Sequence, residues 1–210
     1  MRFINKSNSL VLWISDFKEC NYILSTQEKK WAESLSILRS LEYRKSRGLL
    51  RKTLSNFFDI SPSALPLYSP PGVRPILGEG YGHVSLSHTS NQILIGWSKS
   101  NIGVDIEYSK RTFNAKKLYM RFFSEQEILQ LSRLNIYDLD KEVLKLWVIK
   151  EASIKLFNTK LIYGMKNFIY SKSKVINIDN NQEENLFFAE YKNFSFAIAN
   201  SYSHNIDNLF

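Results

Sequence analysis

The chain has 210 residues, 44% of them hydrophobic, and its 28 Lys and Arg against 20 Asp and Glu give a net charge of +8. That size suits one large domain or two small packed ones, and the positive excess favours an acidic partner: nucleic acid, an anionic membrane surface, a phosphorylated small molecule or an acidic protein. A single cysteine, Cys20, excludes a disulfide framework and a CxxC site, and it indicates a reducing compartment.

The first apolar run, Leu10 to Ile14, is too short for the core of a signal peptide, and Asp16 follows where small residues would be needed. We interpret it as a strand that opens the domain. No stretch approaches the ~20 apolar residues of a membrane span. The sequence therefore predicts a soluble, cytoplasmic protein.

Residues 25–58 contain no proline and have apolar positions at mixed three- and four-residue spacing, which predicts helix with one possible break. Ser25 or Thr26 is suited to cap this helix, with Glu28 in its first turn. All five prolines follow within residues 61–75 and predict a loop.

From residue 81 the pattern alternates. Val84, Leu86 and His88 are predicted on one face of a strand and Ser85 and Ser87 on the other, with a second strand following at residues 92–97.

A third predicted strand spans 102–110, and a helix follows with a capping box formed by Ser124 and Glu127. Another helix covers 144–157, and the tail from 166 to 202 reads as four strands separated by polar turns. Each half of the chain thus runs from helices into strands. This order predicts an α+β protein of two similar halves.

Two carboxylates stand on the third strand. Asp105 and Glu107 are two residues apart and point to one face, while Val104 and Ile106 point to the other. Neighbouring carboxylates repel each other unless a cation joins them, and oxygen ligands of this kind suit Mg²⁺. A strand whose polar face happens to be acidic is the other interpretation, and on this motif alone it is preferred.

The segment WVIKEASIK places Trp147, Glu151 and Lys155 at four-residue spacing along one helix face. A surface ion pair worth about 0.2–0.5 kcal/mol explains this spacing. The alternative is a site in which Glu151 supplies a third carboxylate to a metal ion and Lys155 neutralises a transferring phosphoryl group.

Further candidates lie in the first half of the chain. His88 ends the serine-bearing strand and is a plausible donor to a phosphate, although a lone histidine is more often structural. Arg74 lies in the proline-rich loop, where a guanidinium can be presented to a phosphate. Arg44, Arg47 and Arg51 form a helical stripe, interpreted as a solvated face or, as the functional rival, a nucleic-acid surface.

Taken in order, these segments resemble the 4′-phosphopantetheinyl transferases, specifically the larger Sfp-like subclass. GVRP is similar to the family's Gly-Lys-Pro loop and VSLSHT to its Asn-x-Ser-His strand, while IGVDIE, RFFSEQE and WVIKEASIK match its later motifs. The resemblance runs from about residue 70 to about residue 161. Asn158, Thr159, Lys160 and Leu161 stand where the family usually has Gly-x-Gly-Leu.

The resemblance implies a pseudo-dimer of two α+β halves, residues 1–102 and 103–210, with the active site in the cleft between them. It implies transfer of the phosphopantetheine arm of coenzyme A to a serine of an apo acyl or peptidyl carrier protein, with release of 3′,5′-ADP. The expected enzyme is a Mg²⁺-dependent monomer with an acidic carrier as partner and with no membrane or nucleic-acid partner.

The resemblance also implies roles for individual residues. Asp105, Glu107 and Glu151 would bind Mg²⁺, and Glu151 would also be the base for the incoming serine, with Lys155 on the pyrophosphate. The remaining contacts to coenzyme A would come from Arg74, Ser85, His88 and, on the looser resemblance of STQEKKW to a helix start of the family, from Lys30 or its neighbour Lys29. The alternative function is a non-catalytic, basic α+β binding protein for RNA or an acidic protein on the same scaffold.

Overall fold

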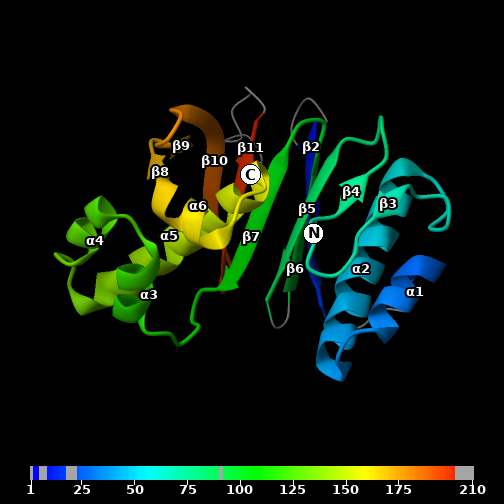
Figure 1. Ribbon diagram of the computed structural model, residues 1–210, viewed down its shortest axis with the longest axis horizontal. Coiled ribbons are helices and arrows are strands. Elements are labelled where there is room, and N and C mark those ends of the chain that lie inside the picture. The colour runs from blue at the N-terminus through cyan, green and yellow to red at the C-terminus, as the bar shows by residue number, and fades with distance from the viewer. Residues whose placement is uncertain (1, 5–8, 18–22, 90–91, 202–210) are drawn as a thin grey trace.

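The computed structural model describes residues 2–4, 9–17, 23–89 and 92–201. Two antiparallel sheets stand face to face, and each is covered on its outer side by helices (Figure 1). The α+β class predicted from the sequence is therefore confirmed. Cys20 and His204 lie outside the described residues.

The first sheet is built from the N-terminal part of the chain. Its strands are ordered β1-β2-β6-β5, and their bounds are β1 Arg2–Ile4, β2 Leu10–Asp16, β5 His83–His88 and β6 Gln92–Ser98. Its outer face is covered by α2 (Ile37–Phe58), which has α1 (Thr26–Glu33) along its far side. The proline-rich loop follows α2 and contains one short strand pair, β3 (Leu67–Tyr68) with β4 (Ile76–Leu77).

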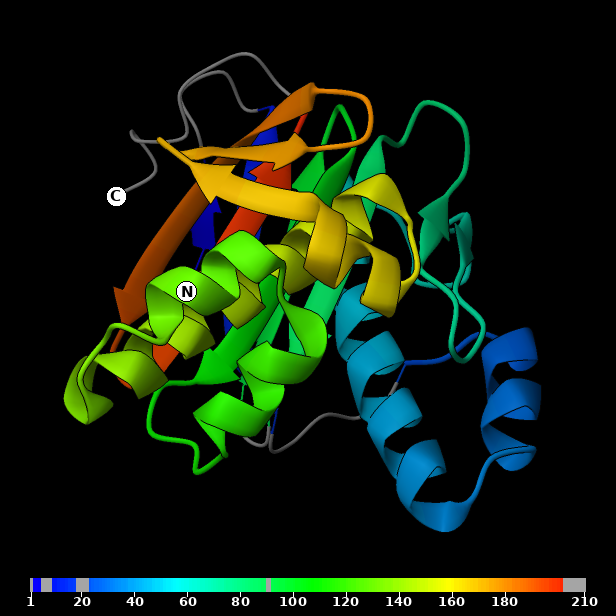
Figure 2. The same cartoon turned by 60° about the vertical axis from the view of Figure 1, so that its left-hand side comes forward.

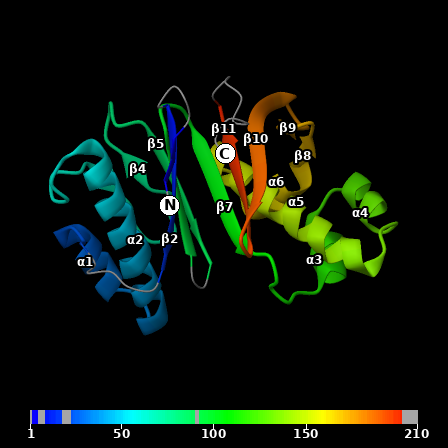
Figure 3. The same cartoon turned by 180° about the vertical axis from the view of Figure 1, so that it is seen from behind.

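The second sheet is built from the C-terminal part and is ordered β7-β11-β10-β9-β8. Its strands are β7 Ile102–Tyr108, β8 Phe168–Ser171, β9 Lys174–Asn177, β10 Gln182–Tyr191 and β11 Phe194–Asn200. The helices beside it are α3 Ala115–Phe122, α4 Glu125–Leu131, α5 Ile136–Phe157 and α6 Leu161–Asn167. Seen from behind, the two groups of helices lie on opposite sides of the paired sheets (Figure 3).

Alternation along the strands produces these layers, because successive side chains of a strand point to opposite faces. In β7, Val104 and Ile106 pack with Leu12 and Phe196 in the apolar layer between the two sheets. Asp105 and Glu107, the residues between and after them, point to the other face, toward α5. The predicted alternation of this strand therefore holds.

Most elements predicted from the sequence are present. The helical region 25–58 breaks once, between α1 and α2, and Ser25 with Glu28 forms a capping box. Ser124 and Glu127 form the capping box of α4 as predicted. The helix α6 was not predicted, because only seven residues form it and their apolar character reads equally well as strand.

Gly103 determines how closely α5 approaches β7. A Cβ atom at this position would lie 1.9 Å from the carbonyl oxygen of Ala152 and 2.4 Å from the amide nitrogen of Leu156. Only glycine allows the backbones of the strand and the helix to come this near. The contact holds the two site-bearing segments, GVDIE and KEASIK, against each other.

The predicted boundary between residues 102 and 103 falls one residue inside β7. The division into two similar halves remains a prediction at this stage. Among the described residues, no helix is long and apolar enough to span a bilayer.

Candidate active site

The centre of the candidate site lies where α5 crosses β7. Lys155 Nζ is 2.7 Å from Asp105 Oδ1 and donates a second hydrogen bond to the carbonyl oxygen of Val104 at 3.1 Å. Among the described residues, Lys155 forms its ion pair with Asp105 and not with Glu151. The four-residue spacing on the helix therefore does not indicate the lysine's partner.

Two serines of β5 connect the first sheet to this cluster. Ser87 Oγ donates to Asp105 Oδ1 at 2.7 Å, and Ser85 Oγ accepts from the amide of Val104 at 3.1 Å. Both side chains are buried. They fix Asp105 and its strand relative to β5.

Three carboxylates share one electrostatic environment beside Lys155. Glu107 pairs with Arg111, four residues further along the chain in the loop that follows β7. Burial, together with the charges of Asp105 and Glu107, raises the pKa of Glu151 to about 7 against the opposing effects of Lys155 and Arg111. The negative charges of Asp105 and Glu107 on β7 therefore make the Glu151 carboxyl on α5 harder to ionise.

Asp105, Glu107 and Glu151 carry oxygen ligands of the kind that a divalent cation binds, but their side chains do not converge on one point in this structure. In the described part of the chain, no three His, Cys, Asp or Glu side chains lie close enough together to hold a metal ion. However, Asp105 Oδ2 is buried and has no hydrogen-bond partner among the residues that the structure describes. A buried carboxylate oxygen of this kind is costly unless a cation or donor reaches it.

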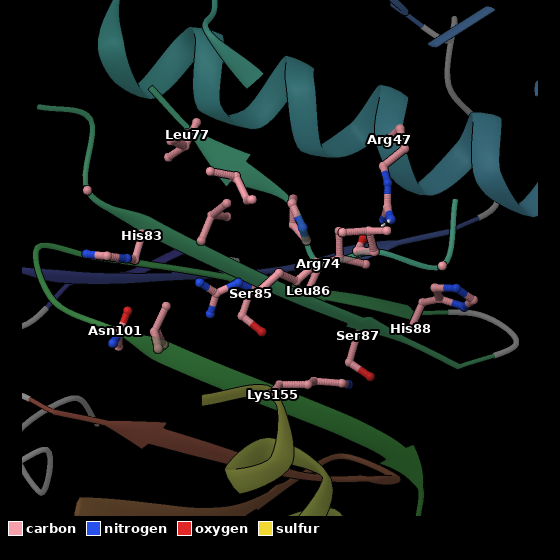
Figure 4. A pocket seen from close by; sticks show the side chains of 17 residues that line it. Arg47, Arg74, Leu77, His83, Ser85, Leu86, Ser87, His88, Asn101 and Lys155 are labelled. Atoms are coloured by element: carbon pink, nitrogen blue, oxygen red, sulfur yellow. Dashed lines mark hydrogen bonds between the residues drawn. The ribbon is translucent and has the colours of Figure 1, made fainter. Parts of the chain in front are cut away.

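A cavity of about 500 Å³ opens beside this cluster, between the proline-rich loop and β5 on one side and the end of α5 on the other (Figure 4). Its lining includes the cations Arg47, Arg74 and Lys155 and the imidazoles of His83 and His88, and no carboxylate is among its described lining residues. Such a cavity attracts an extended anion.

His88 lies at the end of this cavity where β5 ends. Its ring stacks on Phe17 with a centroid separation of 4.9 Å and an interplanar angle of 12°. Part of His88 is exposed, but desolvation of the rest by its neighbours lowers its pKa, with Lys155 and Arg47 acting in the same direction and Glu42 and Asp105 against it. The imidazole is therefore kept neutral to lower pH than usual and can donate one hydrogen bond to a ligand.

Helix α2 contributes Arg47, which the sequence did not single out as a site residue. Arg47 and Arg51 are 9% and 2% exposed, so the helical stripe predicted as a solvated face or a nucleic-acid surface is largely buried. That prediction was wrong because the stripe faces the proline-rich loop rather than solvent. Four-residue spacing identifies a shared helix face but not what covers it.

The predicted contacts to coenzyme A fall into two groups. Arg74, Ser85, His88 and Lys155 line one cavity. Lys30 lies exposed on α1 and is not among the residues lining it. The prediction for Lys30 rested only on the similarity of a short segment at the start of a helix, which does not indicate what the side chain faces.

Other cavity residues were missed by the sequence analysis. His83, Ser87 and Asn101 line the cavity together with the predicted residues. Ser87 is two residues after Ser85 on β5, so strand alternation predicts that both side chains point to the same face. Nothing in the sequence marks Asn101.

The chain matches a known family over its C-terminal half. The model of the 4′-phosphopantetheinyl transferase superfamily matches residues 101–206, just over half of the chain. The chain therefore belongs to the 4′-phosphopantetheinyl transferase superfamily. The resemblance inferred from the motifs is thereby confirmed at the level of the superfamily.

Two cyanobacterial proteins are similar to this chain. It is 30% identical over 114 residues to the 4′-phosphopantetheinyl transferase HetI of Nostoc sp., covering 52% of this chain and 48% of the relative. It is 31% identical over 127 residues to a putative 4′-phosphopantetheinyl transferase of Synechocystis sp., covering 59% and 52%. The chain thus spans about half the length of the curated relatives it matches.

Proposed function

We propose that this protein transfers the 4′-phosphopantetheine arm of coenzyme A to a serine of an apo acyl or peptidyl carrier protein and releases 3′,5′-ADP. One observation carries the proposal: a cation-lined cavity reaches Lys155, whose ammonium group pairs with Asp105 and lies within the electrostatic range of Glu151. Membership of the superfamily supports the same reaction class.

The cavity gives each charged part of coenzyme A a partner. Arg74 and His88 would hold the 3′-phosphate end, with Arg47 as an additional cation, and Lys155 would bind the pyrophosphate. Arginine suits the phosphate because its guanidinium donates two parallel hydrogen bonds. Ser85, which is already bonded to Val104, would shape the wall between these ends.

The chemical step is an in-line displacement at the β-phosphorus. The carrier serine oxygen forms the new bond to phosphorus, the bond from phosphorus to the bridging oxygen of 3′,5′-ADP breaks, and the serine proton passes to Glu151 directly or through water. Lys155 stabilises the negative charge that develops on the pyrophosphate. When coenzyme A binds, the Lys155 ammonium group leaves its ion pair with Asp105 and pairs with the pyrophosphate instead.

Asp105, Glu107 and Glu151 would hold Mg²⁺, and the buried, unpaired Oδ2 of Asp105 supports this assignment. The ion would supply positive charge to the pyrophosphate during transfer. Arg111 would then release Glu107, with which it pairs in this structure.

The cavity takes residues from both predicted halves, since Arg47 and His88 precede residue 102 and Lys155 follows it. This arrangement supports an active site in the cleft between residues 1–102 and 103–210, and two halves in one chain support a monomer. An acidic carrier is the partner that fits the net charge of +8.

The rival function is a basic, non-catalytic binding protein. The burial of Arg47 and Arg51 disfavours its RNA form, because these residues would have to leave α2's contacts to reach a nucleic acid. Three carboxylates beside a lysine also have no purpose in binding an anionic partner.

The test incubates the protein with coenzyme A, Mg²⁺ and a panel of apo carrier proteins, and mass spectrometry follows each carrier. We expect at least one carrier to gain the phosphopantetheine arm at its serine. The Asp105→Ala variant should remain folded but lose transfer and metal-dependent coenzyme binding, whereas Glu183→Ala, in an exposed ion pair, should behave as wild type. Folded wild-type protein that modifies no carrier and binds no coenzyme A would contradict the proposal.

A further inference from the structure

One face of α2 packs against the proline-rich loop. Tyr43, Arg47 and Arg51 follow one another at four-residue spacing and are all buried. Their polar groups point to backbone carbonyls of residues 62–73, the segment that leads directly into Arg74. Figure 2 shows α2 alongside this loop.

The first part of this contact involves Ser69 and Val73. Tyr43 donates its hydroxyl to the carbonyl of Ser69 at 2.8 Å, and Arg47 Nε donates to the same oxygen at 3.3 Å. A second nitrogen of Arg47 lies 3.4 Å from the carbonyl oxygen of Val73, next to Arg74. Tyr43 does not line the 500 Å³ cavity, whereas Arg47 does.

The second part is made by Arg51. Its guanidinium donates to the carbonyl oxygens of the loop at 2.7, 3.2 and 3.4 Å, with Pro62, Leu65 and Leu67 as acceptors. Glu28 binds the same guanidinium through both carboxylate oxygens, at 2.8 and 2.9 Å.

Glu28 couples this contact to α1. It is fully buried and also accepts from the amide of Ser25 at 2.8 Å in the capping box. The start of α1, the middle of α2 and the loop are therefore joined by one hydrogen-bonded chain of buried groups. A network of this kind favours one arrangement of its members, because each buried polar group left without a hydrogen bond lowers the stability of the fold.

The loop depends on these donors. All five prolines of the chain lie in it, and proline has no amide to donate, so the loop has fewer backbone donors than a segment of ordinary residues. The carbonyl oxygens of Leu65 and Pro70 accept amides of the loop itself, whereas the side chains of α2 supply donors to Pro62, Leu67, Ser69 and Val73. The carbonyls that α2 binds belong to Pro62 and to residues that flank the later prolines before Arg74. Without the donors of α2, the loop would be free to move Arg74 relative to β5.

We propose that Tyr43, Arg51 and Glu28 are positioning residues for coenzyme A: they fix the proline-rich loop so that Arg74 stays at the cavity and binds the anionic end of the coenzyme. This inference rests on the proposed function. None of the three residues lines the 500 Å³ cavity. Tyr43 lines a smaller hollow beside it that also includes Arg47 and His88, but its hydroxyl donates to the carbonyl oxygen of Ser69, so we assign its effect to the loop.

The decisive variant is Tyr43→Phe, because it removes one hydroxyl and keeps the ring that lies under the guanidinium of Arg47. We expect the KM for coenzyme A to rise about 3- to 10-fold, the effect of one hydrogen bond. The kcat and the KM for the carrier should change less than about 2-fold, because the residues at the reacting phosphate are not disturbed.

A double-variant cycle separates positioning from general destabilisation. In an Arg74→Ala background, Tyr43→Phe should raise the coenzyme KM less than about 2-fold, because the residue that it positions is gone. Arg51→Lys keeps the charge beside Glu28 and loses the fork that reaches the loop, so it should raise the coenzyme KM as Tyr43→Phe does. Ile14→Val, in the layer between the sheets, is the control that lowers stability without touching the loop.

Three outcomes decide the inference. An unchanged coenzyme KM in folded Tyr43→Phe and Arg51→Lys would overturn it, and so would equal effects of Tyr43→Phe with and without Arg74. Binding of coenzyme A to each variant, measured by calorimetry without a carrier, gives the same comparison independently of transfer. Wild-type protein that neither binds coenzyme A nor transfers its arm would overturn the proposed function itself.

Discussion

At the scale of single residues, Lys155 could pair with Glu151 on its own helix or with Asp105 on β7, and in the structure it pairs with Asp105. Asp105 on β7 takes the ammonium group, while Glu151 on the lysine's own helix influences it only through its charge. The lysine therefore stands at the meeting point of α5, β7 and the cavity. This position is the reason for proposing that Lys155 acts in the reaction, since a solvated helix pair would not face a cavity.

Replacing Lys155 should affect catalysis more than folding. We expect Lys155→Met to lower the rate of transfer by at least ~10²-fold, as loss of a group that stabilises developing charge does. Its free energy of unfolding should fall by only about 1–3 kcal/mol, because Asp105 keeps the hydrogen bond from Ser87. Kinetics and urea unfolding measure the two effects.

The matched control is Lys145→Met, which removes a lysine from the same helix that pairs with Glu142. It should leave both quantities near the wild-type values. A Lys155→Met protein that transfers at the wild-type rate would remove Lys155 from the site.

His88 gives a second prediction at this scale. Burial holds the pKa of its imidazole below the ordinary value of about 6.5, so the unfolded chain binds the proton first as pH falls. The stability that comes from the neutral ring is complete above the unfolded pKa and is lost as pH falls through the folded pKa. The His88→Gln variant should show a flatter dependence of unfolding free energy on pH in that range.

Denaturant unfolding of both proteins between neutral and mildly acid pH measures this difference. His83→Gln is the control, because His83 lines the same cavity at the opposite end of the same strand and does not share the ring stacking of His88 on Phe17. Parallel pH profiles for wild type and His88→Gln would contradict the assignment.

At the scale of elements, the contact of α5 with β7 assembles the site. The strand contributes Asp105 and Glu107 and the helix contributes Glu151 and Lys155, and the two backbones approach through Gly103. The glycine of IGVDIE is therefore explained by packing and not by a turn. Its neighbours on the strand then follow the alternation of the sheet.

Gly103→Ala should separate the two elements. The added methyl would overlap the backbone of Ala152, and overpacking of this kind costs typically ~1–3 kcal/mol and sometimes more. We expect a lower melting temperature and a rate of transfer, per folded molecule, at least ~10-fold below wild type, because shifts of about 1 Å at a site are costly.

Val143→Ala serves as the control, since it destabilises the same helix from a fully buried position. Its rate per folded molecule should stay near that of wild type. Equal rates in Gly103→Ala and wild type would show that the close approach is not needed for catalysis.

At the scale of the whole molecule, the net positive charge would act on the encounter with the proposed acidic carrier. A net charge of +8 raises the association rate with an acidic carrier, and salt screens this attraction over about 10 Å at ~0.1 M ionic strength. We expect kcat/KM for the carrier to fall several-fold as salt rises from low to physiological concentration.

Sucrose at matched osmolality is the control for effects unrelated to charge. The rate should respond to NaCl and much less to sucrose. An identical response to both would show that charge does not steer the carrier, and a different basis for recognition would then be required.

The sequence by itself determined the class of fold, the strand alternation that sets Asp105 and Glu107 on one face, the caps of α1 and α4, and the superfamily. These features depend on local periodicity and on motifs that are continuous in the chain, so neighbouring residues suffice to predict them. Asn158 illustrates this, since it ends α5 in the left-handed conformation that asparagine tolerates.

Only the tertiary structure decided which groups meet. Lys155 pairs with Asp105 across 50 residues, Ser87 reaches Asp105 from the other sheet, and Arg51 pairs with Glu28 inside a stripe that the sequence placed in solvent. Periodicity states which residues share a face, but what covers that face depends on segments far away in the chain. The partners of a side chain, and therefore its role at the site, follow from that packing.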